Sequence, residues 1–533
     1  MGSRRANLHR QLRGRRNELD LFRWWRLASA TGKEFRVKAA LTWVIACLIV
    51  AGPAWGGNVP AWRGDAGNAQ HTAKAPAAGQ ALAKFHWQMP VDLAPRVHRK
   101  PQGEILIHYA SPMITAKNTV LVPVKTTANG AFEIDAVKGA TGSKVWKQTT
   151  DYLLPPYDWL PPLPAHLTKQ NRLYFAGAGG TVYFRDTPDS KTGNSGQLAF
   201  FGISNYQQDE SVYNQNVMID TPITADEQGN IYFGFVVLGS TPLGLKSGIA
   251  RMDSSGNGIW ISAGDAANEQ EISQVAMNCA PAISADGSTL YITVSDGGSG
   301  YLVGLDSTTL APKYRARLLD PVDKQVAGIS DDSSAAPTIG PDGQVFYGVL
   351  ESSPHNCRGW MLQFSPDLAT EGTPGSFGWD DTVSIVPRGG TRPGTVHDYY
   401  LMSKYNNYID CDNGDGHNEI AILNPKKTQQ DHYSTATVMK EVETILDPHQ
   451  VPGEPQGAVY EWCINTAVVD RDNKSVIANA EDGYTYRWDL TTNTFSEMLN
   501  LNQPIGEAYT PTLIGPDGTI YAINDATLYA IGN

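Results

Sequence analysis

The sequence predicts an all-β fold made of repeated antiparallel sheets. Three observations support it: a composition with Gly 52, Pro 33 and Tyr 23 but only 18% charged residues, a recurring hairpin pattern, and almost no amphipathic helical window after about residue 60. Gly and Pro suit tight turns, while aromatic residues suit strands. Helix-rich classes, including Rossmann-type and barrel enzymes, are disfavoured by the same observations.

The repeated element is a short hairpin. Residues 338–348 (TIGPDGQVFYG) and 512–522 (TLIGPDGTIYA) nearly coincide, and looser copies begin near residues 222, 281 and 466. In each copy Pro or Thr opens an apolar strand, an Asp-Gly pair or its equivalent supplies the turn, and a second strand rich in Tyr, Phe, Ile and Val follows. The pattern predicts one supersecondary unit copied along the chain.

A third strand and a tryptophan-ended stretch complete many copies, as at Trp146, Trp260 and Trp488, for which packing is the expected role. Four-stranded sheets repeated around an axis form a β-propeller. Eight first-strand anchors lie near residues 112, 164, 222, 281, 337, 402, 466 and 511, a spacing of about 57 residues. Eight blades are therefore expected. The degenerate copies near 164 and 402 leave seven as the alternative, and a β-sandwich array would not need so regular a period.

The last copy, from residue 511, has room for only three strands. Residues 84–89 (KFHWQM) precede the first full repeat and are expected to supply the missing outer strand. Such a pairing of the chain's two ends would close the ring and remove exposed sheet edges.

The first 58 residues form a basic leader, and residues 59–533 form the propeller. Residues 1–38 hold eleven Lys and Arg against three acids, and an apolar run at 39–55 follows. This order predicts a signal peptide cut near Ala54, with an uncleaved anchor as the alternative. Lipidation at Cys47 could accompany either. The protein is therefore expected to be exported, periplasmic or extracellular, and held by residues 39–55 if the leader is an anchor.

The rest of the chain is acidic. The whole chain has a net charge of −12 and residues 1–38 have a net charge of +8, so residues 39–533 carry a net charge of −20. A net negative charge of this size argues against nucleic-acid binding. The expected partner is a protein or small molecule at a propeller face, with membrane contact only through the N-terminal segment, and the expected state is a monomer. Beyond the leader, Cys279, Cys357, Cys411 and Cys463 could form two disulfides or stay as buried thiols. Cys357 and Cys411 lie in polar loop sequence and are the pair to consider.

The densest acidic cluster is the Gly-rich run at 410–420. Oxygen ligands that alternate along such a loop suit Ca²⁺, and the run resembles the calcium loops of integrin-type propellers, although Cys411 stands where their first Asp would be. A solvated turn is the alternative. The candidate ligands are Asp410, Asp412, Asn413, Asp415 and Glu419.

A second loop, at 388–398, lies at the entry to a degenerate repeat. Loops on a rigid scaffold are where ligand contacts gather, and an ordinary connection is the alternative. Its candidate ligand- or partner-binding residues are Arg388, Arg392, His397 and Asp398.

The repeats resemble those of the quinoprotein-like propeller superfamily. The resemblance rests on the Asp-Gly turns, on the segment from Glu133 to Trp146, and on the run at 62–71 (WRGDAGNAQH). The carboxy half from residue 397 resembles bacterial secreted propellers known mainly as hypothetical proteins. In the dehydrogenases of the superfamily the resemblance implies pyrroloquinoline quinone (PQQ), a calcium ion held by Glu, Asn and Asp, and an Asp base. This chain has no adjacent Cys pair, and no residues match the calcium set.

Two functions follow. The first is an exported propeller that serves as a binding or assembly scaffold at the cell envelope, without catalysis. The alternative is a PQQ-dependent dehydrogenase or a related propeller enzyme. No cofactor is fixed by the sequence: Ca²⁺ is the first candidate and PQQ the second. An enzyme should gather polar side chains at one mouth of the central channel, whereas a scaffold should expose an apolar rim.

Overall fold

The computed structural model describes residues 75–95, 109–128, 130–155, 162–329, 335–388, 398–409, 411–463, 467–502 and 510–533. The chain divides into two units, Met1–Gly57 and Asn58–Asn533, and every described residue belongs to the second. The leader, its apolar run and the segment at 62–71 lie outside the described residues. No helix among the described residues is long and apolar enough to span a membrane.

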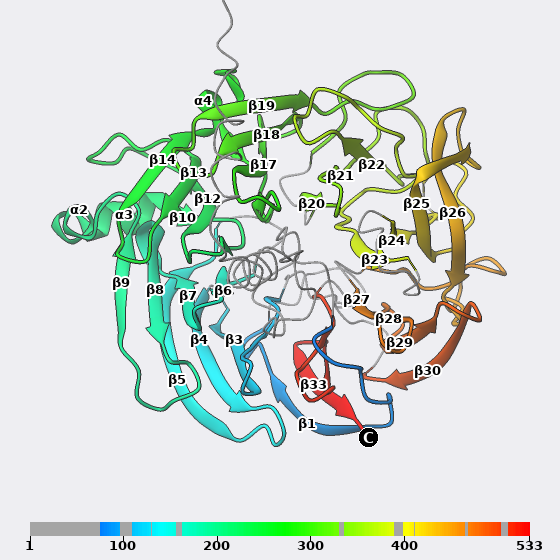
Figure 1. Cartoon of the computed structure of the whole chain (residues 1–533), viewed down its shortest axis with the longest axis horizontal. Coiled ribbons are helices and arrows are strands. Elements are labelled where there is room, and N and C mark those ends of the chain that lie inside the picture. Colours follow the sequence, from blue (N-terminus) through cyan, green and yellow to red (C-terminus); the bar gives the residue numbers. More distant parts are fainter. Residues whose placement is uncertain are drawn as a thin grey trace, which may run out of the picture. The chain divides into compact units, whose positions relative to one another are not determined.

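The second unit is a ring of eight antiparallel sheets, each running outward from the axis (Figure 1). The eight-bladed propeller expected from the repeats is thereby confirmed. The first blade comprises β2 (Met113–Ile114), β3 (Thr119–Thr127), β4 (Gly130–Lys138) and β5 (Lys144–Leu153), and the second comprises β6 (Ala165–Leu167), β7 (Arg172–Ala176), β8 (Thr181–Asp186) and β9 (Ser195–Ala199). The third comprises β10 (Val217–Ile219), β11 (Thr224–Ala225), β12 (Ile231–Val237), β13 (Gly248–Met252) and β14 (Gly258–Ser262). The fourth comprises β15 (Gln274–Val275), β16 (Ala282–Ile283), β17 (Thr289–Ser295), β18 (Gly300–Asp306) and β19 (Pro312–Arg317).

The other four blades follow the same plan, and the few helices are short. The fifth blade comprises β20 (Thr338–Ile339), β21 (Val345–Val349) and β22 (Trp360–Phe364), and the sixth comprises β23 (Ser384–Pro387), β24 (Tyr399–Tyr405), β25 (Glu419–Gln430) and β26 (Thr437–Leu446). The seventh comprises β27 (Val468–Asp470), β28 (Ser475–Asn479), β29 (Tyr484–Asp489) and β30 (Thr494–Asn500). The eighth comprises β31 (Leu513–Ile514), β32 (Ile520–Asn524), β33 (Thr527–Gly532) and β1 (Lys84–Pro90). The helices among the described residues are η1 (Ala178–Gly180), α2 (Ile203–Gln208), α3 (Glu210–Asn216) and α4 (Ala263–Ala267).

The predicted Asp-Gly turns join the first and second strands of their blades. Gly343 and Gly518 both have φ of 84°, a left-handed conformation that costs glycine little. The preceding aspartates accept backbone hydrogen bonds across the turn, such as Asp517 from Thr519 at 3.0 Å. These turns set the register that places alternate strand residues in the core between blades.

The sixth blade begins earlier than the sequence indicated. Its innermost strand is β23, and Met402, the expected first-strand anchor, lies in the second strand, opposite Ser384. The two strands are separated by the long connection at 388–398 instead of a tight Asp-Gly turn. The hairpin signal used for the other blades is therefore missing here.

The ring is closed by β1, as predicted from residues 84–89. It pairs antiparallel with β33 from Lys84–Gly532 to Pro90–Thr527, so the chain's N-terminal strand is the outer strand of the eighth blade. Trp87 of this strand donates a hydrogen bond from Nε1 to the Gly139 carbonyl of the first blade at 2.7 Å. Its ring lies so close to Gly142 that a Cβ there would be 2.8 Å from the indole. Trp87 therefore connects the last blade to the first.

The fifth blade has three regular strands, and its outer edge is covered by an arm from the sixth. The pairing of β25 with β26 skips from Asn424 to Thr428, and the hairpin beyond this bulge is the arm. Met439 of the arm donates its backbone N–H to the Pro374 carbonyl at 2.8 Å. Val438 packs in the same core cluster as Leu362 and Phe364 of β22. Neighbouring blades thus share one core here.

Trp87→Ala should destabilise the propeller by about 2–4 kcal/mol, because it removes the indole hydrogen bond and its packing between the eighth and first blades. The measurement is chemical denaturation followed by intrinsic fluorescence. Phe85→Ala in the same strand, where the ring is 39% exposed, is the control and should cost less than half as much. Equal losses would show that Trp87 does not join the blades.

Candidate functional site

Two ends of the ring can be told apart from the strand order. Each blade runs from its innermost strand outward, so blade-to-blade connections and second-to-third-strand turns emerge at one end, here called the connection end. The first-to-second and third-to-fourth turns emerge at the other, here called the hairpin end. Because innermost strands border the axis, residues next to them at the connection end lie nearest the mouth of the central channel.

The predicted metal loop lies at the connection end, between β24 and β25. Cys411 of this loop forms a disulfide with Cys357, which lies between β21 and β22. The bond therefore ties the corresponding turns of the fifth and sixth blades. The other two cysteines, Cys279 and Cys463, are buried free thiols.

Three of the carboxylates proposed as ligands in this loop, those of Asp412, Asp415 and Glu419, have protein partners. Asp412 accepts the backbone N–H of Asn356 at 3.0 Å, and the Asn413 N–H is 3.2 Å from the Asn356 side-chain oxygen. Asp415 accepts from Asn407 at 2.7 Å. Glu419 accepts from a threonine hydroxyl, that of Thr444, at 3.0 Å. Asp410 lies outside the described residues, and calcium binding stays a prediction from the sequence.

The second predicted loop lies at the opposite, hairpin end, between β23 and β24. Of its four candidates, Arg388 and Asp398 are described, and Arg392 and His397 lie outside the described residues. Arg388 Nη1 lies 3.1 Å from Asp398 Oδ2, with both side chains about half exposed. The structure therefore does not bring this loop together with the metal loop.

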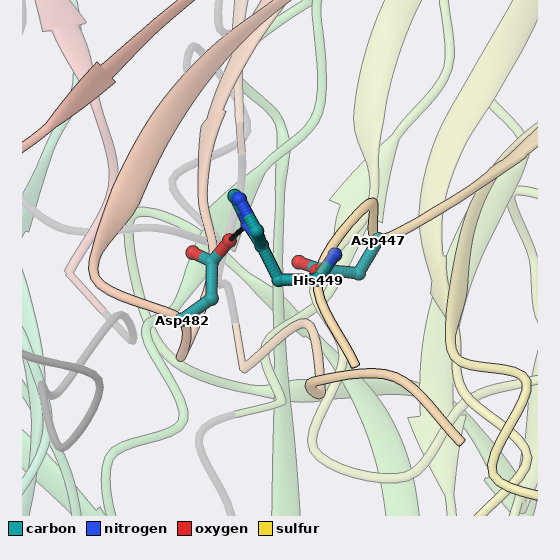
Figure 2. Close-up of side chains that lie close together, drawn as sticks. All are labelled: Asp447, His449 and Asp482. Carbon is teal, nitrogen blue, oxygen red and sulfur yellow. Dashed lines mark hydrogen bonds and ion pairs between the residues drawn. The ribbon is translucent and has the colours of Figure 1, made fainter. Parts of the chain in front are cut away.

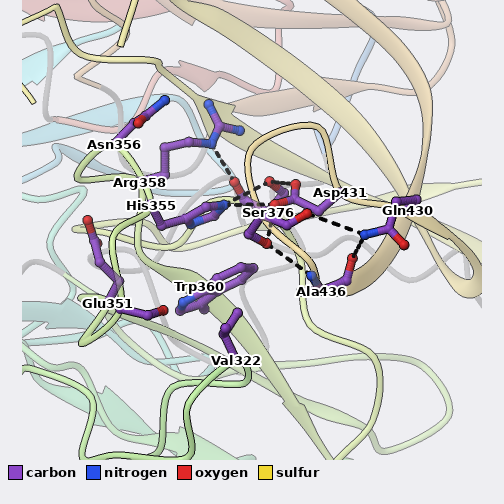
Figure 3. Close-up of polar contacts among 12 residues, drawn as sticks. Val322, Glu351, His355, Asn356, Arg358, Trp360, Ser376, Gln430, Asp431 and Ala436 are labelled. Carbon is purple, nitrogen blue, oxygen red and sulfur yellow. Dashed lines mark hydrogen bonds and ion pairs between the residues drawn. The ribbon is translucent and has the colours of Figure 1, made fainter. Parts of the chain in front are cut away.

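A buried polar network holds the arm of the sixth blade onto the fifth (Figure 3). His355 stacks on Trp360 with ring centroids 3.8 Å apart, while its two ring nitrogens face the Gly359 carbonyl and the Asp431 carboxylate, each at 3.1 Å. Burial opposes ionisation of Asp431, but hydrogen bonds from His355, Ser376 and a further serine, Ser434, lower its pKa. The network stabilises a joint between blades, because its members bind one another.

Arg358 is a second part of this joint. Its guanidinium is fully buried between the Tyr405 and Tyr433 rings, 4.3 Å from each centroid, a favourable cation–π arrangement. Nε donates to the Ser376 carbonyl at 2.8 Å, and Nη1 donates to the Asn406 carbonyl at 2.5 Å. The arginine thus joins the turn before β22 to the end of β24.

A different polar cluster lies nearer the axis at the connection end. Asp381 precedes the innermost strand β23 by three residues, and Ser403 and Lys404 lie near the end of β24. Asp381 and Lys404 are each 2% exposed, and the Ser403 hydroxyl donates to Asp381 Oδ2 at 2.6 Å. Burial raises the pKa of Asp381 to about 6, although the charge of Lys404 and the serine hydrogen bond oppose the shift.

Lys404 is the buried cation of this cluster. Among the described residues its ammonium forms no ion pair within 4.0 Å, and it lies 6.0 Å from the Phe377 ring centroid. A carboxylate titrating near neutral pH beside a buried ammonium is a combination that concentrates at functional sites. A carboxyl group of this kind can accept or donate a proton near neutral pH.

Glu461, Cys463 and Glu481 lie beside this cluster, before and beside the innermost region of the seventh blade. One ligand atom of each lies within 4.8 Å of the others. Burial, followed by the charges of Glu481 and Glu461, raises the pKa of the Cys463 thiol. Cys463 is therefore held as a neutral thiol and is a poor nucleophile.

Sequence patterns gave no signal for Asp381 or Lys404. Asp381 follows Asp380 in a loop and Lys404 lies in a strand, and no motif links the two across the 22 residues between them. Glu481 precedes Asp482-Gly483, a pair that indicates a tight turn. In that context Glu481 is read as an ordinary turn residue and not as part of a functional site. Tertiary structure brings these groups together: Asp381 and Lys404 meet because β23 pairs with β24 within the sixth blade, and Glu481 meets Glu461 and Cys463 at the start of the seventh.

A groove with a volume of about 700 Å³ lies at the connection end of the third blade. Most of the residues that line this groove are small or carry a hydroxyl group; Lys246 is the only cation among them, and none is aromatic. The lining residues are Val237, Leu238, Gly239, Ser240, Thr241, Gly244, Leu245, Lys246, Ser247, Ser262, Gly264, Gln270, Ile272 and Ser273.

Eight radial sheets closed by an N-terminal strand define the class of fold, an eight-bladed β-propeller. The chain is similar to a solved europium-containing methanol dehydrogenase, with a TM-score of 0.51 and 9% identity over 86% of this chain and 89% of that one. A quinohemoprotein alcohol dehydrogenase from Comamonas testosteroni gives a TM-score of 0.47 and 11% identity over 93% and 85%. No family model and no curated protein matches the sequence. At this identity the first likeness shows the fold alone.

Asp381 should make stability depend on pH. Its folded pKa is raised from 3.8 to about 6, so the unfolded chain ionises first and the folded state loses stability as pH rises from about 4 to 6. Asp381→Asn cannot ionise. The wild-type protein should therefore lose up to about 3 kcal/mol relative to this variant over that range, measured by denaturation at stepped pH. A difference that does not change with pH would contradict the burial of an ionisable Asp381.

Reduction of the Cys357–Cys411 disulfide, which spans 54 residues, should lower the free energy of unfolding by about 2–4 kcal/mol. Thermal unfolding with and without a phosphine reductant measures the loss. Cys411→Ser should show the loss already and should not respond further to the reductant. A response in that variant would assign the effect to another bond.

Proposed function

We propose that this protein is a propeller enzyme related to the quinoprotein dehydrogenases, acting on a small hydroxyl-bearing substrate at the connection end of the sixth blade. The observation that carries the proposal is the buried Asp381, with a pKa of about 6, beside Ser403 and the buried Lys404. The likeness to a methanol dehydrogenase supports it. Of the two functions expected from the sequence, the comparisons favour the enzyme over the scaffold.

The proposed chemistry is proton transfer assisted by a fixed charge. At neutral pH the Asp381 carboxylate accepts the proton of a substrate hydroxyl, and the Lys404 ammonium stabilises the negative charge left on the substrate oxygen. The Ser403 hydroxyl, 2.6 Å from Asp381 Oδ2, orients the carboxylate. Because both charged side chains are nearly excluded from water, their effect on a bound substrate is stronger than at an exposed site.

The described residues at this end do not fit PQQ. A planar quinone with several carboxylates needs cations and an aromatic face on which to stack. The second cation beside Lys404, Arg358, is enclosed by the Tyr405 and Tyr433 rings. The nearby tryptophans are engaged as well: Trp360 stacks on His355, Trp379 contacts Tyr408, and Trp462 contacts Tyr486 and Phe495. We therefore assign no step to a quinone.

We also propose that the protein works outside the cytoplasm. The leader pattern of the first 58 residues supports export. The Cys357–Cys411 disulfide supports it independently, because such bonds persist in oxidising compartments.

Asp381→Asn should lower turnover at least about 100-fold, because it removes the proton acceptor. The assay follows reduction of an artificial electron acceptor by the purified protein with primary alcohols or aldoses, each with and without PQQ and Ca²⁺. Asp367→Asn, an exposed residue in the turn after β22 at the hairpin end, is the control and should keep wild-type turnover.

Each arm of the assay decides a point. Turnover that needs PQQ would identify the quinone-dependent class despite the residues described above. Turnover without it would identify a related propeller enzyme. If no substrate is turned over and neither PQQ nor Ca²⁺ changes the melting temperature, the enzyme proposal is wrong and the scaffold function is favoured.

A further inference from the structure

Three side chains of metal-ligating types converge between the sixth and seventh blades, and none of them belongs to the two loops singled out in the sequence. Asp447 and His449 lie in the connection from β26 to β27, and Asp482 lies in the turn between β28 and β29. One ligand atom from each lies within 4.8 Å of the other two. Figure 2 shows the three side chains grouped, with His449 between the two carboxylates.

His449 is held in place by its neighbours. Its Nδ1 lies 2.6 Å from Asp482 Oδ2 and 3.0 Å from the Tyr486 hydroxyl, and its ring stacks on Tyr484 with centroids 4.7 Å apart. Its backbone N–H donates to Asp447 Oδ1 at 2.8 Å. The imidazole and both carboxylates are thereby preorganised.

One ligand atom of this group has no partner of its own. Asp447 is 2% exposed, and its Oδ2 is buried without a hydrogen bond in the described structure. A buried polar atom left unpaired costs about 1–3 kcal/mol, so such atoms are uncommon in native proteins. In this group the unpaired oxygen belongs to one of three converging ligands, the position at which a cation would bind.

The charges of the group support the same conclusion. Within the described residues neither Asp447 nor Asp482 forms an ion pair with Lys or Arg. Two neighbouring acids without a basic side chain are therefore stabilised by whatever positive charge binds between them.

We propose that Asp447, His449 and Asp482 bind a divalent transition-metal ion of the Zn²⁺ type. One imidazole nitrogen with two carboxylate oxygens matches the ligands of Zn²⁺, whereas Ca²⁺ prefers oxygen ligands alone. Three protein ligands leave the fourth tetrahedral position to water. The ion would connect the sixth blade's outgoing connection to the seventh blade, and the site is independent of the function proposed for Asp381.

The test uses the full chain, stripped with EDTA and titrated with Zn²⁺ or Ca²⁺ by calorimetry. We expect one Zn²⁺ per chain at this site and no binding of Ca²⁺ there. Asp447→Asn keeps the side-chain oxygen that accepts the backbone N–H of His449, but it replaces a charged ligand with a neutral one. The affinity for Zn²⁺ should therefore fall at least about tenfold. The metal-free variant should melt no lower than the wild-type protein, because the unpaired Oδ2 makes no hydrogen bond to lose.

Cys463→Ser is the matched control, since the Glu461, Cys463 and Glu481 group is the other convergent set among the described residues. It should leave Zn²⁺ affinity unchanged, and absorption of Co²⁺ bound in place of Zn²⁺ should lack a thiolate charge-transfer band. The proposal is overturned if Cys463→Ser abolishes binding while Asp447→Asn does not, or if the stripped wild-type chain binds no Zn²⁺.

Discussion

The pairing of β1 with β33 is the constraint on which the rest of the ring depends. These strands are more than 430 residues apart in sequence and form one antiparallel ladder. Without it the eighth blade would end on an unpaired strand edge, and its contacts with the first blade through Trp87 would be lost. Closure also fixes the positions of the eight innermost strands, and hence of every side chain carried at the connection end.

The fifth, sixth and seventh blades are joined by more than apolar packing. A disulfide, the His355–Asp431 pair and the caged Arg358 all tie the fifth blade to the sixth. Buried charges of this kind cost desolvation energy and are retained where they are paired or where they act. The paired groups account for the joint. Two groups of buried charged side chains are not explained by the joint between the blades: Asp381 with Lys404, and Asp447 with His449 and Asp482. The proposed function depends on the first group and the proposed metal site on the second.

Local patterns were sufficient for the blades because each hairpin is specified by neighbouring residues. An Asp-Gly turn and alternating apolar strands determine a unit by themselves, so the number of blades and the closing strand could be inferred from repetition. Where the local signal was absent, the inference failed: Met402 was placed in a first strand because the connection at 388–398 replaces the tight turn. The arm that covers the fifth blade had no such signal, since its bulge at 425–427 follows from packing on a neighbouring blade.

The sequence by itself determined the all-β class, the eightfold repetition, the closure of the ring and the separation of a basic leader from an acidic body, because these depend on short-range patterning and on composition. It also indicated Cys357 and Cys411 as a pair to consider. Tertiary structure alone decided which charges meet. Asp381 and Lys404 are separated by more than twenty residues and carry no shared motif, and they become neighbours because β23 pairs with β24 within the sixth blade. His449 and Asp482 become neighbours because the connection that leaves the sixth blade and a turn of the seventh blade lie at the same end of the ring.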